Sequence, residues 1–167
     1  MIRLLTYNIK SGGHGREALI LDILRQSQAD IIVLQEVFDD TPLPAFAQTL
    51  DMNYYIAASN VKWHVALLSR FPISSALSHR QPPIFRGLLE ATLAVGQQQL
   101  QVFGVHLYAN LAIGAELRRY RELTPILKHL APYTARPCLI AGDFNAVAPG
   151  DRVVIEFDLA SDDKMTR

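Results

Sequence analysis

The sequence lacks several features that define whole classes of protein. Its 167 residues include a single cysteine, Cys138, so no intrachain disulfide can form. No apolar stretch reaches the length of a membrane span. Charge of one sign is not in excess either, because 16 lysine and arginine residues balance 16 aspartate and glutamate residues. The chain therefore has no disulfide framework and no strong overall field that would attract polyanions in general.

The N-terminus also lacks a targeting pattern. Met1 leads directly into an apolar run, without a charged leader followed by an apolar h-region. Together with the missing membrane span, this predicts a cytoplasmic protein. What the chain has instead is apolar content, because half of its residues are hydrophobic. That fraction excludes disorder as the default and suffices for the core of one domain over residues 1–167.

Apolar patterning divides the chain into helix-like and strand-like segments. Arg16–Gln26 and Ile113–Leu130 have nearly helical spacing, and Pro125 is expected to kink or divide the second helix. A third, short helix is expected from Pro42 through Leu50. The β-type runs are Ile2–Ile9, Ile31–Gln35, Tyr54–Ala58, Val65–Ser69, Ile73–His79, Leu88–Val95, Leu100–His106 and Leu139–Ala141. Helices that flank strand-rich blocks predict a layered α/β or α+β fold.

Two polar segments favour a structural interpretation over a functional one. Ser11–Gly15 is rich in glycine, but it lacks the spacing and the lysine of a P-loop, and we interpret it as a flexible connector. The basic residues Arg118, Arg119 and Arg121 are interleaved with glutamates. That pattern indicates a solvated helix face rather than a phosphate-binding patch.

The segment Cys138–Asn145 carries the strongest chemical signal in the chain. An apolar run ends there in a glycine, a carboxylate at Asp143 and an amide at Asn145. Because side chains alternate along a strand, Asp143 and Asn145 are expected on one side of the strand's end if the extended geometry continues. A carboxylate that accepts a proton, beside an amide that donates to an oxyanion, suits water-mediated attack on phosphorus.

Three other segments place a polar group at the end of an apolar strand, where loops converge over a rigid scaffold. They are Leu4–Ile9 with Asn8, Asp30–Val37 with Glu36, and Gln101–Leu107 with His106. A further segment, Val65–Ile73, is similar to an "(I/L)LSR.PI" strand and turn. In this order, the segments resemble the endonuclease/exonuclease/phosphatase family, the fold of pancreatic deoxyribonuclease and of the exonuclease III type of repair enzyme. The resemblance runs from the first residues to about Asp151.

The resemblance implies a fold and a set of site residues. The fold is a four-layer α/β/β/α sandwich of two packed β-sheets. Glu36 is implied as a ligand of Mg²⁺ or Mn²⁺ with Asn8 beside it in the same metal site, and Asp143 as the group that orients or deprotonates the attacking water. Asn145 and His106 are implied as hydrogen-bond donors to the phosphate. Each also has a structural alternative, such as a surface carboxylate for Glu36, a loop cap for Asn8 and a buried core histidine for His106.

Three further residues are candidates for substrate contact. Arg86 opens a run similar to the family's "RG.L.A" pattern, and it is expected either near the phosphate or in a structural pair. Tyr108 and Asn110 lie in a region that often contacts substrate in the family, although they match no tight motif. The implied substrate is a phosphate ester of a nucleic acid, a lipid headgroup or a small phosphate. Asp39 and Asp40 count against duplex DNA, because they would repel its phosphate backbone.

The end of the chain departs from the family pattern. Family members finish with a strand led by an "S-D-H" run, whose Asp orients a catalytic His. Here only 22 residues follow Asn145, and none of the five histidines follows an Asp. We therefore expect a single domain that lacks its C-terminal strands, with an incomplete second sheet whose open edge favours a homo-oligomer.

Taken together, these features imply a divalent-metal-dependent hydrolase of phosphodiester or phosphomonoester bonds, weakened by the missing Asp-His motif. The alternative is a non-catalytic fragment that acts as a binding or structural module. A third interpretation is a site that a partner chain completes.

Overall fold

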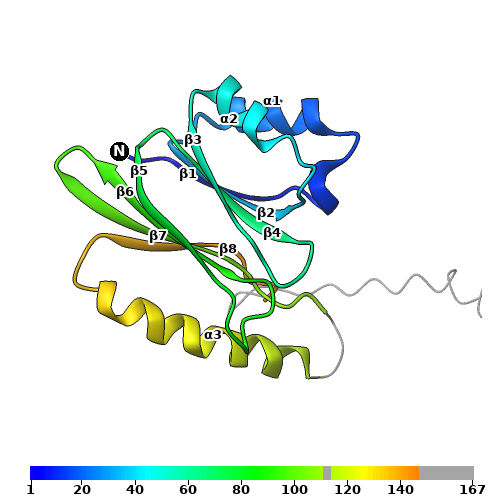
Figure 1. Cartoon of the computed structure of the whole chain (residues 1–167), viewed down its shortest axis with the longest axis vertical. Coiled ribbons are helices and arrows are strands. Elements are labelled where there is room, and N and C mark those ends of the chain that lie inside the picture. The colour runs from blue at the N-terminus through cyan, green and yellow to red at the C-terminus, as the bar shows by residue number, and fades with distance from the viewer. Residues whose placement is uncertain (111–113, 147–167) are drawn as a thin grey trace, which may run out of the picture.

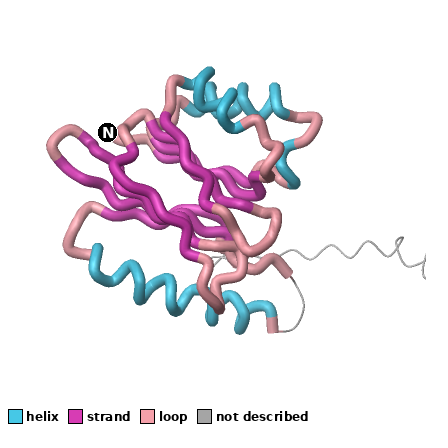
Figure 2. The backbone as a smooth tube through the Cα atoms, in the orientation of Figure 1, coloured by secondary structure: helices cyan, strands magenta, loops and turns pink. Residues whose placement is uncertain are grey.

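A computed structural model of the chain describes residues 1–110 and 114–146. These residues form two packed four-stranded β-sheets with helices on their outer faces, so that four layers follow one another as α/β/β/α (Figure 1). Figure 2 shows the strands of both sheets in the middle of the molecule and the helices on its two outer sides. The layered α+β architecture expected from the sequence is confirmed.

The first sheet has the strand order β1-β2-β4-β3. Strand β1 runs parallel to β2, whereas β4 pairs antiparallel with both β2 and β3. Helices α1 and α2 cover its outer face (Figure 1). The elements are β1 (Leu4–Asn8), the 3₁₀ turn η1 (Ser11–Gly13), α1 (Glu17–Ser27), β2 (Ile31–Val37), α2 (Leu43–Leu50), β3 (Asn53–Ala57) and β4 (His64–Ser69). Because both faces of β2 are covered, its sequence is an almost continuous apolar run.

The second sheet has the strand order β5-β6-β7-β8. Strand β6 pairs antiparallel with β5 and β7, and β7 runs parallel to β8. The connection from β7 to β8 passes through α3, which lies along the outer face of this sheet (Figure 1). The elements are β5 (Ile73–His79), β6 (Leu88–Val95), β7 (Gln98–His106), α3 (Ala115–Leu130), the 3₁₀ turn η2 (Ala131–Tyr133) and β8 (Cys138–Asp143).

Apolar side chains fill the three spaces between the four layers. Alternation along β2 sends Ile32 and Leu34 toward the helices and Ile31 and Val33 toward the other sheet. Further members are Ile20, Leu24 and Phe46 in the first space, Leu67, Leu89 and Leu93 in the middle one, and Phe103, Ile126 and Leu130 in the third. The middle space fixes the two sheets against each other and thereby the relative positions of their strand ends.

The boundaries expected from the sequence lie within about two residues of the observed ones for the described elements. Pro125 does not divide α3, which continues from Ala115 to Leu130. Leu123, Ile126 and Leu130 lie on both sides of the proline and pack against the second sheet, which offsets the backbone hydrogen bond that proline removes. None of the described helices is long and apolar enough to cross a membrane.

Candidate active site

The carboxyl ends of four strands meet at one edge of the sandwich. Parallel pairing places Asn8 of β1 opposite Gln35 of β2, and His106 of β7 opposite Asp143 of β8. Strands β1 and β8 are the neighbouring edge strands of the two sheets, and they contact each other. Asn8, Glu36, His106 and Asp143 therefore lie together at one edge, and we refer to these four residues as the strand-end site.

Asn8 connects the two carboxylates of the strand-end site. Its amide Nδ2 donates hydrogen bonds to Glu36 Oε1 at 3.2 Å and to Asp143 Oδ2 at 3.0 Å. Its Oδ1 accepts a hydrogen bond from the backbone N–H of Lys10 at 2.9 Å, which fixes the orientation of the amide. One side chain of the first sheet thus holds a carboxylate from each sheet.

Glu36 reaches the site because β2 is irregular at this position. The pairing with β4 shifts between Gln35 and Val37, and Glu36 has a φ of 60°, in the left-handed region that side chains rarely adopt. A bulge of this kind re-aims a side chain and commonly lies next to a functional site. Glu36 Oε2 accepts a hydrogen bond from the backbone N–H of Ser11 at 2.7 Å. The glycine-rich segment, interpreted as a connector, therefore also positions this carboxylate.

Asn145 reaches the same region by a different geometry from the one expected. Strand β8 ends at Asp143, and Asn145 has a φ of 49°, so the extended backbone does not continue. The chain turns because the backbone N–H of Asn145 donates to Asp143 Oδ1 at 2.9 Å, a local bond typical of Asp in turns. Asn145 Nδ2 then donates to the carbonyl of Leu107 at 3.0 Å. Strand alternation was the wrong reason for placing Asp143 and Asn145 together.

His106 is buried at the end of β7 and contacts both a cation and a carboxylate. Its Nε2 accepts a hydrogen bond from Nη1 of Arg86 and lies 3.9 Å from Asp143 Oδ2. The Arg86 guanidinium also donates to the carbonyl of Leu107 at 3.4 Å and stacks on the ring of Trp63 at 5.0 Å. Arg86 therefore lies beside the strand-end site.

The environment of His106 keeps its imidazole neutral. Burial first, and then the charge of Arg86, lower the pKa of His106 to about 4, although the carboxylates of Asp143 and Glu36 oppose the shift. Burial likewise lowers the pKa of Arg86. A neutral imidazole that accepts at Nε2 carries its proton on Nδ1, and this atom is buried without a hydrogen-bond partner in the described part of the chain.

We expect His106 to make the protein less stable as the pH falls from 6.5 to 4. In that interval the unfolded chain binds a proton at His106 and the folded chain does not, so the free energy of unfolding decreases. A shift from 6.5 to about 4 corresponds to a loss of about 3 kcal/mol. The measurement is urea unfolding across this interval for the wild type and for His106→Asn. The variant should lose less stability on acidification, and equal losses in the two proteins would contradict the assignment.

Tyr108 and Asn110 lie on the loop that follows β7, and α3 holds this loop. The backbone N–H of Tyr108 donates to Glu122 Oε2 at 2.9 Å, and Arg119 Nη1 donates to the carbonyls of Tyr108 and Asn110 at 3.0 and 3.1 Å. Arg118 stacks on the ring of Tyr108 at 3.8 Å. The loop carrying both candidates is thus fixed at the same end of the sheet as His106.

The interpretation of this part of α3 as a solvated face was wrong for Arg119 and Glu122. Both are buried, and burial raises the pKa of Glu122. The sequence contains a signal for this, because Ala115, Arg119, Glu122 and Ile126 recur at spacings of three and four and form one helical stripe. The two residues lie in that stripe and bind the loop backbone.

The comparisons with known proteins agree with this architecture. A family model described as "Endonuclease/Exonuclease/phosphatase family" matches residues 5–154. The structure of TDP2 from Caenorhabditis elegans has a TM-score of 0.74 at 19% identity, covering 87% of this chain and 48% of that one. The human Nocturnin catalytic domain with bound sulfate has a TM-score of 0.73 at 24% identity, covering 87% and 64%. ANGEL2, described as a 2′,3′-cyclic phosphatase, has a TM-score of 0.73 at 19% identity, covering 89% and 54%.

At these identities the likeness to solved structures establishes the fold alone. The chain spans about half of the length of the C. elegans structure, at 48%. No curated protein sequence matches the chain.

Proposed function

Since the chain belongs to the Endonuclease/Exonuclease/phosphatase family, whose members hydrolyse phosphodiester or phosphate-ester bonds, we propose that it is a divalent-metal-dependent phosphoesterase. The observation that carries the proposal is the pair of hydrogen bonds from Asn8 to Glu36 and Asp143. They join carboxylates that are 107 positions apart in sequence (143 minus 36) at one edge of the fold. Converging acidic groups of this kind suit hydrolysis at phosphorus.

The donor set of the proposed metal site fits Mg²⁺ or Mn²⁺. Family enzymes commonly use divalent metals, and Glu36 offers carboxylate oxygens, the hard ligands that these ions prefer. Asn8 lies beside it with Nδ2 toward Glu36, so its Oδ1 would become a second ligand only if the amide turns over and releases the backbone N–H of Lys10. The two oxygens of Glu36 accept hydrogen bonds from neutral N–H groups, and no lysine or arginine among residues 1–110 and 114–146 forms an ion pair with it. Because these donors are neutral, they do not cancel the negative charge of Glu36, which can still attract a cation. When bound, the metal would neutralise charge at the phosphate.

We assign the proton-accepting role to Asp143. Its carboxylate is held by donors on both oxygens, the amide of Asn8 and the backbone N–H of Asn145, so its orientation toward a water molecule is fixed in advance. Asn145 uses one N–H on the carbonyl of Leu107, and the second N–H of the amide is assigned to a phosphate oxygen.

The cationic donor to the phosphate is Arg86 in this proposal. Its guanidinium lies between His106 and the ring of Trp63, and the neutral imidazole holds it in place as an acceptor. For His106 itself to donate to a phosphate oxygen from Nε2, Arg86 must turn away and Nε2 must gain a proton. Tyr108 and Asn110 remain proposed substrate contacts on the neighbouring loop.

The proposed substrate class is a phosphate ester of a nucleic acid, a lipid headgroup or a small phosphate.

Self-association is a further part of the proposal. Edge strands β1 and β8 lie side by side, and each pairs with only one strand within the described ranges. Unpaired edges of two sheets at one side of the molecule favour pairing with another chain, and a homo-oligomer would use this side.

The first test is metal-dependent turnover of bis-p-nitrophenyl phosphate. We expect hydrolysis with Mg²⁺ or Mn²⁺ and none with EDTA. In Glu36→Gln the amide cannot replace the carboxylate charge, so calorimetry should show the weak Mg²⁺ or Mn²⁺ site of the wild type disappear together with turnover. Identical binding isotherms for the two proteins would refute the metal site.

Two controls keep this test interpretable. Asp22→Asn removes an exposed carboxylate on α1 that pairs with Arg25, and it should leave binding and turnover unchanged. Turnover per chain is also measured over a range of protein concentrations. A rise with concentration supports completion of the site by association, whereas absence of metal-dependent turnover at every concentration supports the non-catalytic alternative.

A further inference from the structure

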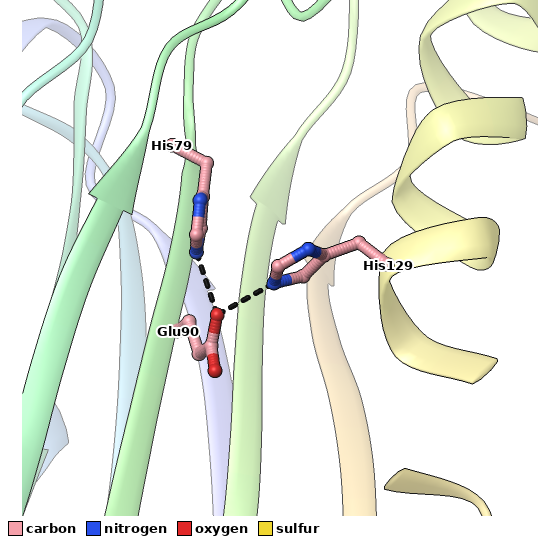
Figure 3. A group of neighbouring side chains, drawn as sticks. All are labelled: His79, Glu90 and His129. Atoms are coloured by element: carbon pink, nitrogen blue, oxygen red, sulfur yellow. Dashed lines mark hydrogen bonds and ion pairs between the residues drawn. The ribbon is translucent and has the colours of Figure 1, made fainter. Parts of the chain in front are cut away.

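A second group of metal-ligand side chains lies away from the strand-end site, between the outer face of the second sheet and α3. His79 of β5, Glu90 of β6 and His129 of α3 point toward one another there (Figure 3). Nε2 of each histidine lies 2.6 Å from Glu90 Oε2. One carboxylate oxygen therefore contacts two imidazoles that come from different elements of the fold, β5 and α3.

The other oxygen of Glu90 is held by separate donors. Tyr133 OH and Gln101 Nε2 donate to Oε1 at 2.8 and 3.1 Å, and Gln101 Oε1 in turn accepts a hydrogen bond from Thr92 at 2.9 Å. Hydrogen-bond donors of this kind, which bind one oxygen of a carboxylate, orient the carboxylate and fix the direction in which its other oxygen points. They leave Oε2 directed at the two histidines.

The charge of the cluster also favours a cation. Although burial raises the pKa of Glu90, hydrogen bonds from His129, Tyr133 and His79 lower it below its usual value, so Glu90 is an anion at neutral pH. The two imidazole rings lie against each other with their centroids 4.3 Å apart. Two protonated imidazoles at that separation would repel each other, whereas one divalent ion supplies the positive charge at a single point.

We propose that His79, Glu90 and His129 bind one divalent transition-metal ion, with Zn²⁺ as the best match. Two imidazole nitrogens and one carboxylate oxygen form a ligand set that Zn²⁺ takes with three protein ligands and one open position. The three ligand atoms lie within 4.8 Å of one another. Tetrahedral ligands at about 2.0–2.1 Å from Zn²⁺ are themselves roughly 3.3 Å apart, so small side-chain rotations suffice.

Each neutral imidazole must then carry its proton on Nδ1. The fourth position has room for a water molecule, because a cavity of about 150 Å³ beside the cluster is lined by both histidines and by Gln81. His129 is 38% exposed, which leaves an entry path for the ion.

The ion would connect β5, β6 and α3 and would stabilise the docking of the helix on the sheet. Anything that binds only the folded chain raises its stability by mass action. The nitrogen-rich cluster also differs in metal preference from the all-oxygen site at Glu36, which selects hard ions. The two sites can therefore be tested separately.

The test uses the full chain with Glu36→Gln, so that the strand-end site does not contribute, after dialysis against EDTA. Calorimetric titration with ZnCl₂ should show one site per chain, and Zn²⁺ should raise the melting temperature. Adding His79→Gln or His129→Gln should weaken Zn²⁺ binding by at least about tenfold. Even the loss of a residue that only hydrogen-bonds a metal ligand typically costs that much affinity, and these two residues are proposed as the ligands themselves. The increase in melting temperature should disappear as well.

His14→Gln is the matched control, because His14 lies 2.9 Å from the Asp40 carboxylate but belongs to no three-residue ligand group among residues 1–110 and 114–146. It should leave the Zn²⁺ isotherm unchanged. Circular dichroism of each variant checks folding, and Co²⁺ in place of Zn²⁺ gives absorption bands that report tetrahedral nitrogen and oxygen ligation independently of stability. If the parent protein does not bind Zn²⁺, or if binding survives both histidine variants, the proposal is wrong.

Discussion

Asp143→Asn should lower metal-dependent phosphodiester hydrolysis by about 10²–10⁴-fold, the usual contribution of general acid–base help. An amide cannot take the proton of the attacking water. Asp143 also accepts hydrogen bonds from Asn8 and from the backbone of Asn145, and an asparagine retains only one acceptor oxygen for them. One of these bonds is lost at a cost of about 0.5–1.5 kcal/mol, which is too little to unfold the chain.

The measurement is steady-state turnover of bis-p-nitrophenyl phosphate with Mg²⁺ or Mn²⁺, together with urea unfolding of the same preparations. Asp22→Asn is the control for removal of a carboxylate elsewhere on the surface. A large loss of turnover with nearly unchanged stability would support the role of Asp143 in chemistry. Turnover within twofold of the wild type would exclude Asp143 as the proton acceptor.

Gly142→Ala should destabilise the fold by at least about 3 kcal/mol and disrupt the strand-end site at the same time. Gly142 pairs with Val105 in the parallel ladder of β7 and β8, and it has a φ of 146°. A Cβ atom added there would lie 2.0 Å from the carbonyl oxygen of Val105 and 2.8 Å from its carbonyl carbon and nitrogen. These are backbone atoms of a buried strand, so β8 would have to move away, and both overpacking and backbone strain contribute to the cost.

Gly96→Ala provides the matched control, because Gly96 also has a positive φ, at 59°, but a Cβ there meets nothing within 4 Å. Gly96→Ala should lower the free energy of unfolding by only about 1–2 kcal/mol, because a side chain is disfavoured in the left-handed backbone conformation. Urea unfolding measures both variants, and metal binding or turnover reports whether Asp143 keeps its place. Equal destabilisation by the two substitutions would show that close approach of β7 and β8 at Gly142 is not important.

Local pattern was sufficient to predict the helices and strands and to mark several polar residues that follow apolar strands. Apolar runs of period two and period 3.6 predicted the strands and helices within about two residues, because these elements are set mostly by local chain geometry and by which face is buried. Asn8, Glu36, His106 and Asp143 each follow an apolar run, and parallel pairing places such ends together. The family resemblance added the order of these segments.

Packing overruled the local interpretation in other places. Pro125 was expected to kink or divide the helix, yet α3 is not divided, and Ile126 and Leu130 after the proline pack against the second sheet. Arg119 and Glu122 were interpreted as solvated charges, but both are buried and bind backbone groups of the loop after β7. Such pairing depends on residues far apart in the chain, which no local pattern records.

The sequence by itself determined the layered α+β class, the polar residues that follow the apolar strands, and the fact that one cysteine cannot form an intrachain disulfide. Only the tertiary structure decided how these groups interact. It joined Asn8 to Glu36 and Asp143, and it lowered the pKa of His106 by burying it beside Arg86. It also brought His79 and His129 onto one oxygen of Glu90. The physical reason is that burial, charge and ligand geometry depend on distances between elements, which are set by the packing of the two sheets and α3 rather than by spacing along the chain.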